Sequence, residues 1–554
     1  MLTCHLTPFS HNPISKFQYK YVYFISKLHI LHYVSKFGIM KESIPMDLAL
    51  YLAIFFGLWV SQVVYSVYLK PKKLEKLLRQ QGIKGTSYNP IHGDNLVMQE
   101  MANEALSKPM SLNHNIVPRV NPFVDQMVQK YGNICLCWRG TRPTLIIAEA
   151  ELMKMILSDK DGLIQKPPAN PFVALLSLGL SNLEGQKWAK RRRLINPAFH
   201  HQKLLGMVPE FIASCGKRID YWKKLVDSSS SAEGTEIDVS SELHSLSADV
   251  IARTAFGSSY EEGKKIFQLQ QEQAFLINEA FHSLYFPGLR FIPTKKNRRR
   301  YEVDKEIKDM LREIVNKKKR AMLDGESSGD TDLLGLLLQC KEKGNEMSMD
   351  DVIEECKLFY FAGHETTANW LTWTLICLAI HPEWQEKARQ EVLQICGDKT
   401  PDADVLNRLK IVTMVLNEVL RLYPLVVNLW RYTARATRIG GITIPAGVEL
   451  NLPTVLLHHS SEYWGDDAQE FKPERFAEGV SKATIKDQAT AFYPFGWGSR
   501  ICIGQNFANI EAKLALSMIL QNFSFKLSPS YVHAPYTIIS LQPQHGAPLI
   551  FQKI

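Results

Sequence analysis

The sequence predicts a mainly helical protein with little sheet and one helix long enough to cross a membrane. Two observations carry this prediction: helical patterns fill the middle of the 554-residue chain, and a long uncharged run precedes them. The helical patterns cover 188–196, 243–256, 298–322, 348–380 and 382–395. Strand-like runs, such as 144–148 and 448–452, are shorter and fewer.

Composition excludes several classes of protein. Apolar residues make up 45% of the chain and charged residues 22%, so it is neither disordered nor a polytopic membrane protein. The net charge of +9 suits a membrane surface or an acidic partner, but by itself it does not indicate nucleic acid. The nine cysteines are odd in number and scattered, which argues against a disulfide framework and favours a reducing compartment.

The uncharged run, 48–69, predicts a membrane anchor. As a helix, its 22 residues cover about 33 Å, enough for a bilayer core of about 30 Å. Six cations follow it closely: Lys70, Lys72, Lys73, Lys76, Arg79 and Lys84. Positive residues stay on the cytosolic side, which predicts a single-pass protein whose remaining chain is cytosolic. Pro71 is expected to break the helix. The alternative is a buried helix of a soluble core.

This span divides the chain into four predicted parts. Residues 1–45 form an N-terminal extension, 46–69 the anchor, 70–90 a basic, proline-containing linker, and 91–554 one large catalytic domain. The extension has no assigned structural role, and the span would begin naturally at Met46. We therefore interpret 1–45 as an alternative or mispredicted start, which peptides from this stretch in the native protein would contradict.

The longest helical pattern, 348–380, contains a local contradiction. Ser348 and Asp351 predict a capping box, and Pro382 supplies the stop. The centre reads Phe-Ala-Gly-His-Glu-Thr-Thr over 361–367, although Gly and Thr are poor helix formers. A threonine hydroxyl can also capture a backbone carbonyl and distort the helix. Such conflicts tend to mark functional sites, and the alternative is a harmless polar kink.

Cys502 lies in a glycine-rich loop, 495–504, that precedes a helical pattern over 507–521. Loop amides, the start of that helix and the charge of Arg500 are expected to favour a thiolate. Glycines allow a flat, bulky ligand to approach the backbone closely. The residues alone leave three readings open: a nucleophile, an inert buried thiol, or a ligand of haem iron, which a soft thiolate suits well.

Four motifs, in order along the chain, resemble those of the cytochrome P450 monooxygenases. The run F-x-x-G-x-R-x-C-x-G over 495–504 resembles the haem-binding loop, and 362–367 resembles the oxygen-activation motif. Glu418 and Arg421 match E-x-x-R, and 471–476 resembles the element that adds a second arginine. E-x-x-R alone is weak, because 386–389 also matches it. The resemblance covers about 46–554. The stretches 82–88, 118–123, 185–199, 254–267 and 495–507 resemble the plant group that includes secologanin synthase and certain gibberellin and triterpene oxidases.

The resemblance implies the cytochrome P450 fold, a helical haem-thiolate domain with small β-sheets, and a role for individual residues. Cys502 would ligate the iron of haem b, and Thr366 with Glu365 would deliver protons. A buried structural triad is expected from Glu418, Arg421 and Arg475. Further haem contacts are expected from Trp188, Arg192, Arg431, Phe495, Arg500 and Gly504. His364 is expected to pack or line the pocket, and 187–193 also reads as a solvated basic face that could dock an acidic reductase.

The implied function is a haem-thiolate monooxygenase in the endoplasmic reticulum membrane, with its catalytic domain in the cytosol. It would hydroxylate a lipophilic, terpenoid-type plant metabolite or hormone with O2. Electrons would come from NADPH through cytochrome P450 reductase, with cytochrome b5 as an additional candidate, and no nucleic acid is expected. Leu425 stands where many relatives have proline, so the nearby pocket gives no substrate prediction. Two alternatives are a haem-thiolate isomerase or dehydratase that does not use O2, and a catalytically dead, membrane-tethered binding protein.

Overall fold

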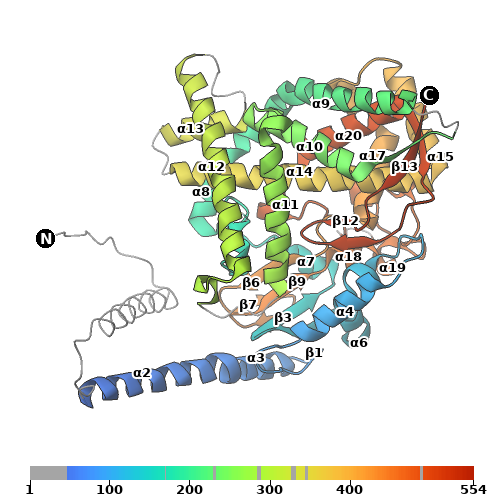
Figure 1. Ribbon diagram of the computed structural model, residues 1–554. Coiled ribbons are helices and arrows are strands. Elements are labelled where there is room, and N and C mark those ends of the chain that lie inside the picture. Colours follow the sequence, from blue (N-terminus) through green and yellow to red (C-terminus); the bar gives the residue numbers. More distant parts are fainter. Residues whose placement is uncertain are drawn as a thin grey trace. The chain divides into compact units, whose positions relative to one another are not determined.

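The computed structural model describes residues 46–168, 170–176, 178–228, 233–282, 288–325, 332–342, 347–486 and 491–554. Contacts divide the chain into two units, Met1–Ser66 and Val67–Ile554. The predicted extension, 1–45, lies outside the described residues. Within the described part, helices dominate and the sheets are small, which confirms the predicted fold class (Figure 1).

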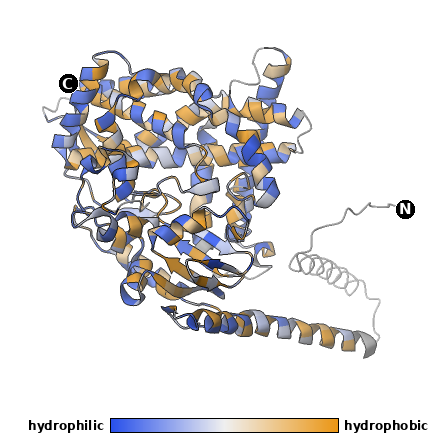
Figure 2. Ribbon diagram, turned by 180° about the vertical axis from the view of Figure 1, so that it is seen from behind, coloured by the Kyte–Doolittle hydropathy of each residue, from blue (hydrophilic) through white to orange (hydrophobic). Residues whose placement is uncertain are grey.

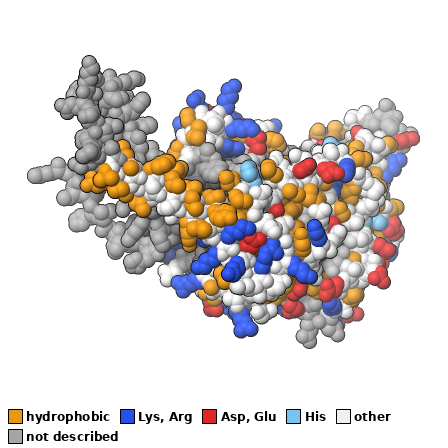
Figure 3. Space-filling view, turned by 90° about the horizontal axis from the view of Figure 1, so that it is seen from below, with side chains coloured by type: hydrophobic (Ala, Val, Ile, Leu, Met, Phe, Trp, Pro, Cys, Tyr) orange, Lys and Arg blue, Asp and Glu red, His pale blue; other side chains and the backbone are white. Residues whose placement is uncertain are grey.

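The apolar run forms a helix whose side chains are exposed. It begins with α2 (Met46–Val64), passes through a π-helical turn, η1 (Tyr65–Leu69), and continues as α3 (Lys70–Arg79). Over Leu50–Arg79 it is long and apolar enough to cross a membrane, and its most apolar window is not buried by other parts of the protein. Figure 2 shows its change from apolar to basic character, and Figure 3 shows the hydrophobic side chains along it.

The prediction that Pro71 breaks this helix is wrong. Pro71 lies in the first turn of α3, directly after the π-helical turn. Proline has no N–H for the carbonyl one turn earlier, and that carbonyl, of Val67, accepts a hydrogen bond from the hydroxyl of Tyr88 instead. The π-helical turn and this replacement donor let the helix pass through the proline.

The helices of the second unit pack around α14 (Met349–Ile380), which runs through its centre (Figure 1). The side chain of Ser348 and the carboxylate of Asp351 form the predicted capping box at its start. The principal helices around it are α8 (Gly185–Ile195), α9 (His201–Ser228), α10 (Val239–Phe256), α11 (Tyr260–His282), α12 (Lys295–Leu323), α13 (Leu333–Glu342), α15 (Pro382–Cys396), α17 (Lys410–Leu422) and α20 (Gln505–Asn522). The predicted helical patterns thus correspond to α8, α10, α12, α14, α15 and α20.

Shorter helices connect these elements and lie near the sheets. The α-helices are α4 (Asn95–Ser107), α5 (Val117–Val120), α6 (Pro122–Tyr131), α7 (Ala150–Leu157), α16 (Ala403–Leu406), α18 (Thr454–His458) and α19 (Ser461–Trp464). The 3-10 helices are η2 (Val173–Leu175), η3 (Asn196–Phe199), η4 (Leu289–Phe291), η5 (Pro473–Phe476), η6 (Val480–Lys482) and η7 (Gly498–Arg500).

The largest sheet has the strand order β1-β2-β3-β9-β6-β4. Its strands are β1 (Lys84–Gly85), β2 (Ile134–Arg139), β3 (Arg142–Ile147), β9 (Glu449–Leu452), β6 (Leu429–Thr433) and β4 (Ile164–Gln165). β1 with β2 and β3 with β9 are parallel, and the remaining neighbours are antiparallel. The antiparallel β4–β6 pair matters most for function, because it sets the chain after Gln165 beside Arg431.

Three small antiparallel sheets complete the second unit. β13 (Pro548–Lys553) pairs with both β10 (Phe523–Leu527) and β5 (Thr235–Asp238). β11 (Pro535–Thr537) pairs with β12 (Leu541–Pro543), and β7 (Thr437–Ile439) pairs with β8 (Ile442–Ile444). The segment between β11 and β12 matters for the site, because Ser540 reaches α14 from it.

Candidate active site

The loop around Cys502 is held by its own backbone and by the end of α7. The N–H of Cys502 donates to the carbonyl of Phe495 at 2.9 Å, which closes the loop. Gly498 has φ +70°, and a Cβ at this position would lie 2.2 Å from the carbonyl oxygen of Leu157. Only glycine fits there without moving the backbone. Gly504 caps α20, so Cys502 lies two residues before that cap.

The thiol of Cys502 is accessible but desolvated by surrounding protein. Among the described cysteines, Cys502 alone has an exposed side chain. Burial nevertheless raises its pKa, against the opposing effects of the Gly504 N–H and the charge of Arg192. A thiol that is accessible and yet surrounded by protein atoms lines a space inside the protein. The loop N–H of Gly504 thus favours a thiolate, as expected, but burial outweighs it, and a bound metal ion would remove the proton outright.

Arg500 does not contribute the charge next to Cys502, contrary to the prediction. Its guanidinium donates to the carbonyl of Leu183 at 2.8 Å and pairs with Glu184, the residue before α8. It also lies 4.0 Å from the ring centre of Trp188. The cation beside the loop is Arg192, whose Nη1 donates to the carbonyl of Ile501 at 3.0 Å. The structure therefore brings the predicted Trp188, Arg192 and Arg500 to one region.

Further cations gather next to this region, and one of them, Arg431, is buried. Arg431 on β6 and Lys166, just after β4, lie close enough to Arg500 to repel it. Burial and then this repulsion lower the pKa of Arg431 to about 10 and that of Lys166 to about 8. Glu184 is the carboxylate that offsets them, and its Oε1 accepts from the N–H of Lys166 at 3.1 Å. Desolvated cations that outnumber their nearby carboxylate form a binding site for an anionic ligand.

Sequence reasoning missed Lys166 and Glu184. Both belong to stretches without a recognisable motif, and Lys166 reaches Arg431 only because Gln165 pairs with Tyr432 across β4 and β6. A signal for Glu184 was available, since it stands directly before the helix that carries Trp188 and Arg192.

The centre of α14 presents an accessible stripe in an otherwise mostly buried helix. Leu358, Ala362 and Thr366 recur every four residues, and each is only partly buried. One helix face therefore borders accessible space. The hydroxyl of Thr366 donates to the carbonyl of Ala362 at 2.8 Å, as predicted for a threonine in a helix interior. The helix remains continuous through this bond.

The stripe and the Cys502 loop belong to one site. Trp370, one turn after Thr366, packs edge-on against Phe495 with ring centres 5.9 Å apart. Its indole N–H donates to the carbonyl of Leu416 on α17, which fixes the ring. Phe495 thus links the cysteine loop to α14.

Glu365 and His364 lie beside the stripe in different surroundings. The carboxylate of Glu365 accepts from the hydroxyl of Ser540 at 2.9 Å and faces the imidazole of His244 on α10. His364 is buried and packs against the rings of Phe267 and His244. Burial lowers the pKa of His364 to about 3, so it is neutral at physiological pH. This agrees with the expectation of a packed histidine.

Glu418 and Arg421 on α17 lie together with Arg475 on η5. Arg421 donates to both oxygens of Glu418, at 2.8 and 2.7 Å, and neither side chain is exposed. Arg475 is more distant, since its Nε lies 3.5 Å from Glu418 Oε1, and its closest carboxylate oxygen is that of Asp467 at 2.7 Å. The structure thus places the predicted triad together, with Asp467 as a fourth member.

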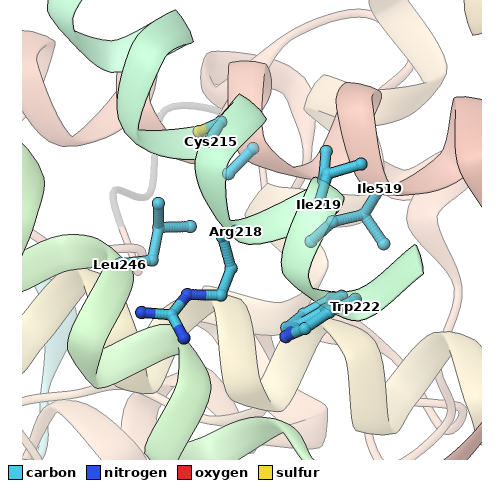
Figure 4. A pocket seen from close by; sticks show the side chains of 7 residues that line it. Cys215, Arg218, Ile219, Trp222, Leu246 and Ile519 are labelled. Carbon is cyan, nitrogen blue, oxygen red and sulfur yellow. The ribbon is translucent and has the colours of Figure 1, made fainter. Parts of the chain in front are cut away.

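A small apolar cavity lies between α9, α10 and α20, away from the predicted site residues (Figure 4). Its lining is apolar except for Arg218, whose guanidinium is paired with Glu242. Figure 4 shows Arg218 and Trp222 extending from α9, with Leu246 and Ile519 contributed by neighbouring helices. No predicted site residue lines it, so we assign it no function.

The residues fit an iron porphyrin. The accessible thiol of Cys502 is the soft ligand that haem iron accepts, and the cation cluster suits its two propionates. The small side chains of the accessible stripe leave room beside them.

Comparison with known proteins decides the family. The family model for Cytochrome P450 matches residues 110–545. This chain belongs to the cytochrome P450 family. Cytochrome P450 CYP72A616 of Paris polyphylla is 49% identical over 506 residues, covering 90% of this chain and 96% of the relative. Cytochrome P450 72A397 of Kalopanax septemlobus is 50% identical over 504 residues, with the same coverage. Cytochrome P450 72A15 of Arabidopsis thaliana is 50% identical over 499 residues, again with that coverage.

The predicted family and its plant affinity are therefore confirmed. The protein is a cytochrome P450 monooxygenase, an oxidoreductase that uses haem iron. A reductase, a substrate and O2 are the partners that this family uses in general.

Proposed function

We propose that this cytochrome P450 hydroxylates a lipophilic, terpenoid-type plant metabolite or hormone at the endoplasmic reticulum membrane. The observation that carries the proposal is the accessible, desolvated thiol of Cys502 in a site bordered by partly desolvated cations. The apolar residues Leu358 and Ala362 on the accessible stripe support a lipophilic substrate.

Each predicted site residue then has a role. Cys502 would ligate the haem iron, and haem, when bound, would supply the oxidative chemistry that side chains lack. The loop residues Phe495 and Gly504 would support the haem, and Thr366 with Glu365 would hold and pass on the protons that the reaction consumes. Trp188, Arg192, Arg431 and Arg500, joined by Lys166, would hold the propionates.

Replacing the proposed ligand tests the haem site. Wild-type holoprotein, reduced and treated with carbon monoxide, is expected to give the red-shifted band of thiolate-ligated haem. Cys502→Ser should abolish that band, because a serine hydroxyl does not replace a thiolate. Cys396→Ser is the matched control, since this cysteine lies at the end of α15 and outside the site. An unchanged band in Cys502→Ser would refute the assignment.

Labelled dioxygen separates a monooxygenase from the two alternatives. Terpenoids and hormone-like diterpenes are incubated with the holoprotein, reductase and NADPH under isotopically labelled O2, and products are analysed by mass spectrometry. One labelled oxygen atom per product is expected. Product that forms anaerobically without NADPH would identify an isomerase or dehydratase. Biological activity that survives Cys502→Ser would identify a binding protein.

The helix Leu50–Arg79 supports single-pass anchoring with the catalytic domain in the cytosol. The chain is expected to stay in microsomes after alkaline carbonate extraction, with the catalytic domain open to added protease. Removing residues 46–69 should release it. Protection of the catalytic domain in sealed microsomes would reverse the orientation.

The outer face of α8 is the proposed docking surface for NADPH–cytochrome P450 reductase, with cytochrome b5 as an additional candidate. Lys187, Lys190 and Arg193 are exposed there, whereas Arg191 pairs with Asp351 and Glu355. Reversing two exposed charges with Lys187→Glu and Arg193→Glu should raise the KM for reductase and weaken its salt dependence. An unchanged carbon monoxide band would show that the haem site is intact.

A further inference from the structure

His244 is the group that faces the free oxygen of the Glu365 carboxylate. Its Nε2 lies 3.6 Å from Glu365 Oε2, and its Nδ1 lies 2.7 Å from the carbonyl oxygen of Ser240, one turn earlier on α10. A carbonyl only accepts hydrogen bonds, so Nδ1 carries a hydrogen. This fixes the ring, leaving Nε2 to exchange a proton with Glu365.

The other oxygen of Glu365 is already occupied. Its Oε1 accepts from the hydroxyl of Ser540 at 2.9 Å and from the amide of Asn369 at 3.3 Å. Asn369 also donates to the Ser540 hydroxyl at 2.9 Å. These bonds hold the carboxylate with Oε2 toward His244, and the next residue along α14 is Thr366 of the accessible stripe.

His244 connects this carboxylate to the surface. It lies at the start of α10, where Asp238 and Ser241 are exposed, and 17% of its own side chain is exposed. Glu365 lies deeper, with 12% of its side chain accessible. The pair therefore spans from the first turns of α10, next to exposed residues, to the centre of α14.

The charges of the pair place the proton on the imidazole. Burial alone would raise the pKa of Glu365, but the nearby imidazole of His244 lowers it to about 2. Burial would lower the pKa of His244. Glu365 outweighs burial, and the Ser240 carbonyl and Asp238 at the end of β5 act in the same direction as Glu365, so the pKa is raised. From α14, His364 also faces the pair and is neutral, and Tyr536 on β11 faces Glu365. Glu365 alone stores no proton at neutral pH.

We propose that His244 is the proton donor that resupplies Glu365 during turnover, an inference that rests on the proposed role of Glu365 and Thr366 in oxygen activation. The Nε2–H bond of the imidazolium breaks and an O–H bond forms at Glu365 Oε2, leaving a neutral imidazole that keeps its Nδ1–H. Water then returns a proton to Nε2. The 3.6 Å separation closes by a shift of about half an ångström or through one bridging water. His244 acts through Glu365, so it is a positioning residue for the reaction.

The first test follows proton-dependent turnover without a known substrate. Holoprotein with purified reductase oxidises NADPH and consumes O2 in H2O and in D2O. His244→Gln is expected to lower the rate roughly tenfold and to raise the solvent isotope effect, because Glu365 is then resupplied with protons more slowly. His201→Gln is the matched control, an exposed histidine at the start of α9 and outside the site, and should keep both values near wild type. If His244→Gln behaves like this control, the proposal is overturned.

The second test does not depend on activity. Carbon-13-labelled histidine in the resting holoprotein is titrated by NMR, and His244 is assigned by the resonance lost in His244→Gln, or in His244→Asn if the first variant does not bind haem. His244 should titrate above the ordinary histidine range, and Glu365→Gln should lower its pKa. If the pKa of His244 is the same in wild type and in Glu365→Gln, the proposal is overturned. Failure of the proposed function can be told apart from failure of the His244 proposal. In the first case the wild-type protein itself would lack the carbon monoxide band or NADPH-dependent O2 consumption.

Discussion

Two Glu–Arg pairs in this protein share one spacing and differ in their surroundings. Glu418 and Arg421 lie on α17, and neither side chain has exposed surface. Glu386 and Arg389 lie on α15, where 53% of the Glu386 side chain is exposed. In the first pair two hydrogen bonds join the side chains, whereas in the second a single Arg389 nitrogen reaches Glu386, at 2.5 Å.

The difference shows which part of the motif depends on the fold. Spacing by three residues places both groups on one helix face, in either pair. Only Glu418 is enclosed, and it also accepts from the backbone N–H of Lys472 at 2.9 Å. Nη1 of Arg421 donates to the carbonyls of His458 and Ala468, and Nη2, which also bonds Glu418, donates to the carbonyl of Glu470. The buried pair thus fastens α17 to the segments that precede the cysteine loop. In the second pair only Arg389 is buried and bonds to other elements, whereas Glu386 is exposed.

The largest effect is expected from Glu418→Gln. This change leaves the charge of Arg421 buried without its carboxylate, at a cost of about 3–5 kcal/mol. The yield of haem-loaded protein and the apparent unfolding temperature should both fall sharply, which the carbon monoxide band and circular dichroism measure. If Glu418→Gln and Glu386→Gln gave the same yield and the same unfolding temperature, burial would not make the first pair more important for stability than the second.

Glu511 on α20 sharpens the comparison, because it is a buried carboxyl group without a cation. It has no exposed surface, and neither oxygen has a hydrogen-bond partner among the described residues. Burial raises its pKa to about 8, against a smaller opposing effect of Ser247. Glu511 is therefore protonated in the folded protein at neutral pH.

We expect the free energy of unfolding to depend on pH, and we expect Glu511→Gln to remove this dependence. Between pH 4.5 and about 8 the folded protein holds a proton that the unfolded chain releases, so stability falls as pH rises. The slope attributable to Glu511 is about 1.4 kcal/mol per pH unit within that window. Unfolding midpoints at several pH values measure it. Identical slopes for wild type and Glu511→Gln would show that Glu511 is ionised inside the protein.

The sequence predicts those parts of the site that neighbouring residues define. The capping box of Ser348, the loop around Cys502 and the pair on α17 all depend on short spacings, and the structure contains each. Lys166 and His244 could not be found in this way, because their partners lie on other elements and meet them through strand pairing or helix packing. Pro71 shows the same limit, since Tyr88 supplies the donor that keeps the helix intact.

An intermediate effect is expected from Arg475→Lys. Arg475 donates to the carbonyls of Trp464 and Asp467 and pairs with the Asp467 carboxylate, while its contact with Glu418 is long, at 3.5 Å. Lysine keeps the charge but cannot serve several acceptors in a fixed plane, so we expect a loss of about 1–2 kcal/mol. The unfolding temperature should fall between those of Glu418→Gln and Glu386→Gln. If Arg475→Lys lowered the free energy of unfolding as much as Glu418→Gln, Arg475 would be essential for stabilising the buried carboxylate of Glu418.

The smallest effect is expected from Glu386→Gln, within about 0.5 kcal/mol, because water screens an exposed carboxylate. Arg389 stays in place without it, since its other nitrogens donate to Gln385 Oε1 and to the carbonyls of Leu520 and Phe523. Arg389→Leu, which strands those acceptors, should cost clearly more than Glu386→Gln. Unfolding temperatures in low and high salt measure both variants, and only the small Glu386 contribution should vanish with salt. The opposite result would be that Glu386→Gln lowers the unfolding temperature as much as Arg389→Leu. That result would mean that the exposed carboxylate keeps Arg389 in place, and that spacing rather than burial determines how strongly such a pair stabilises the protein.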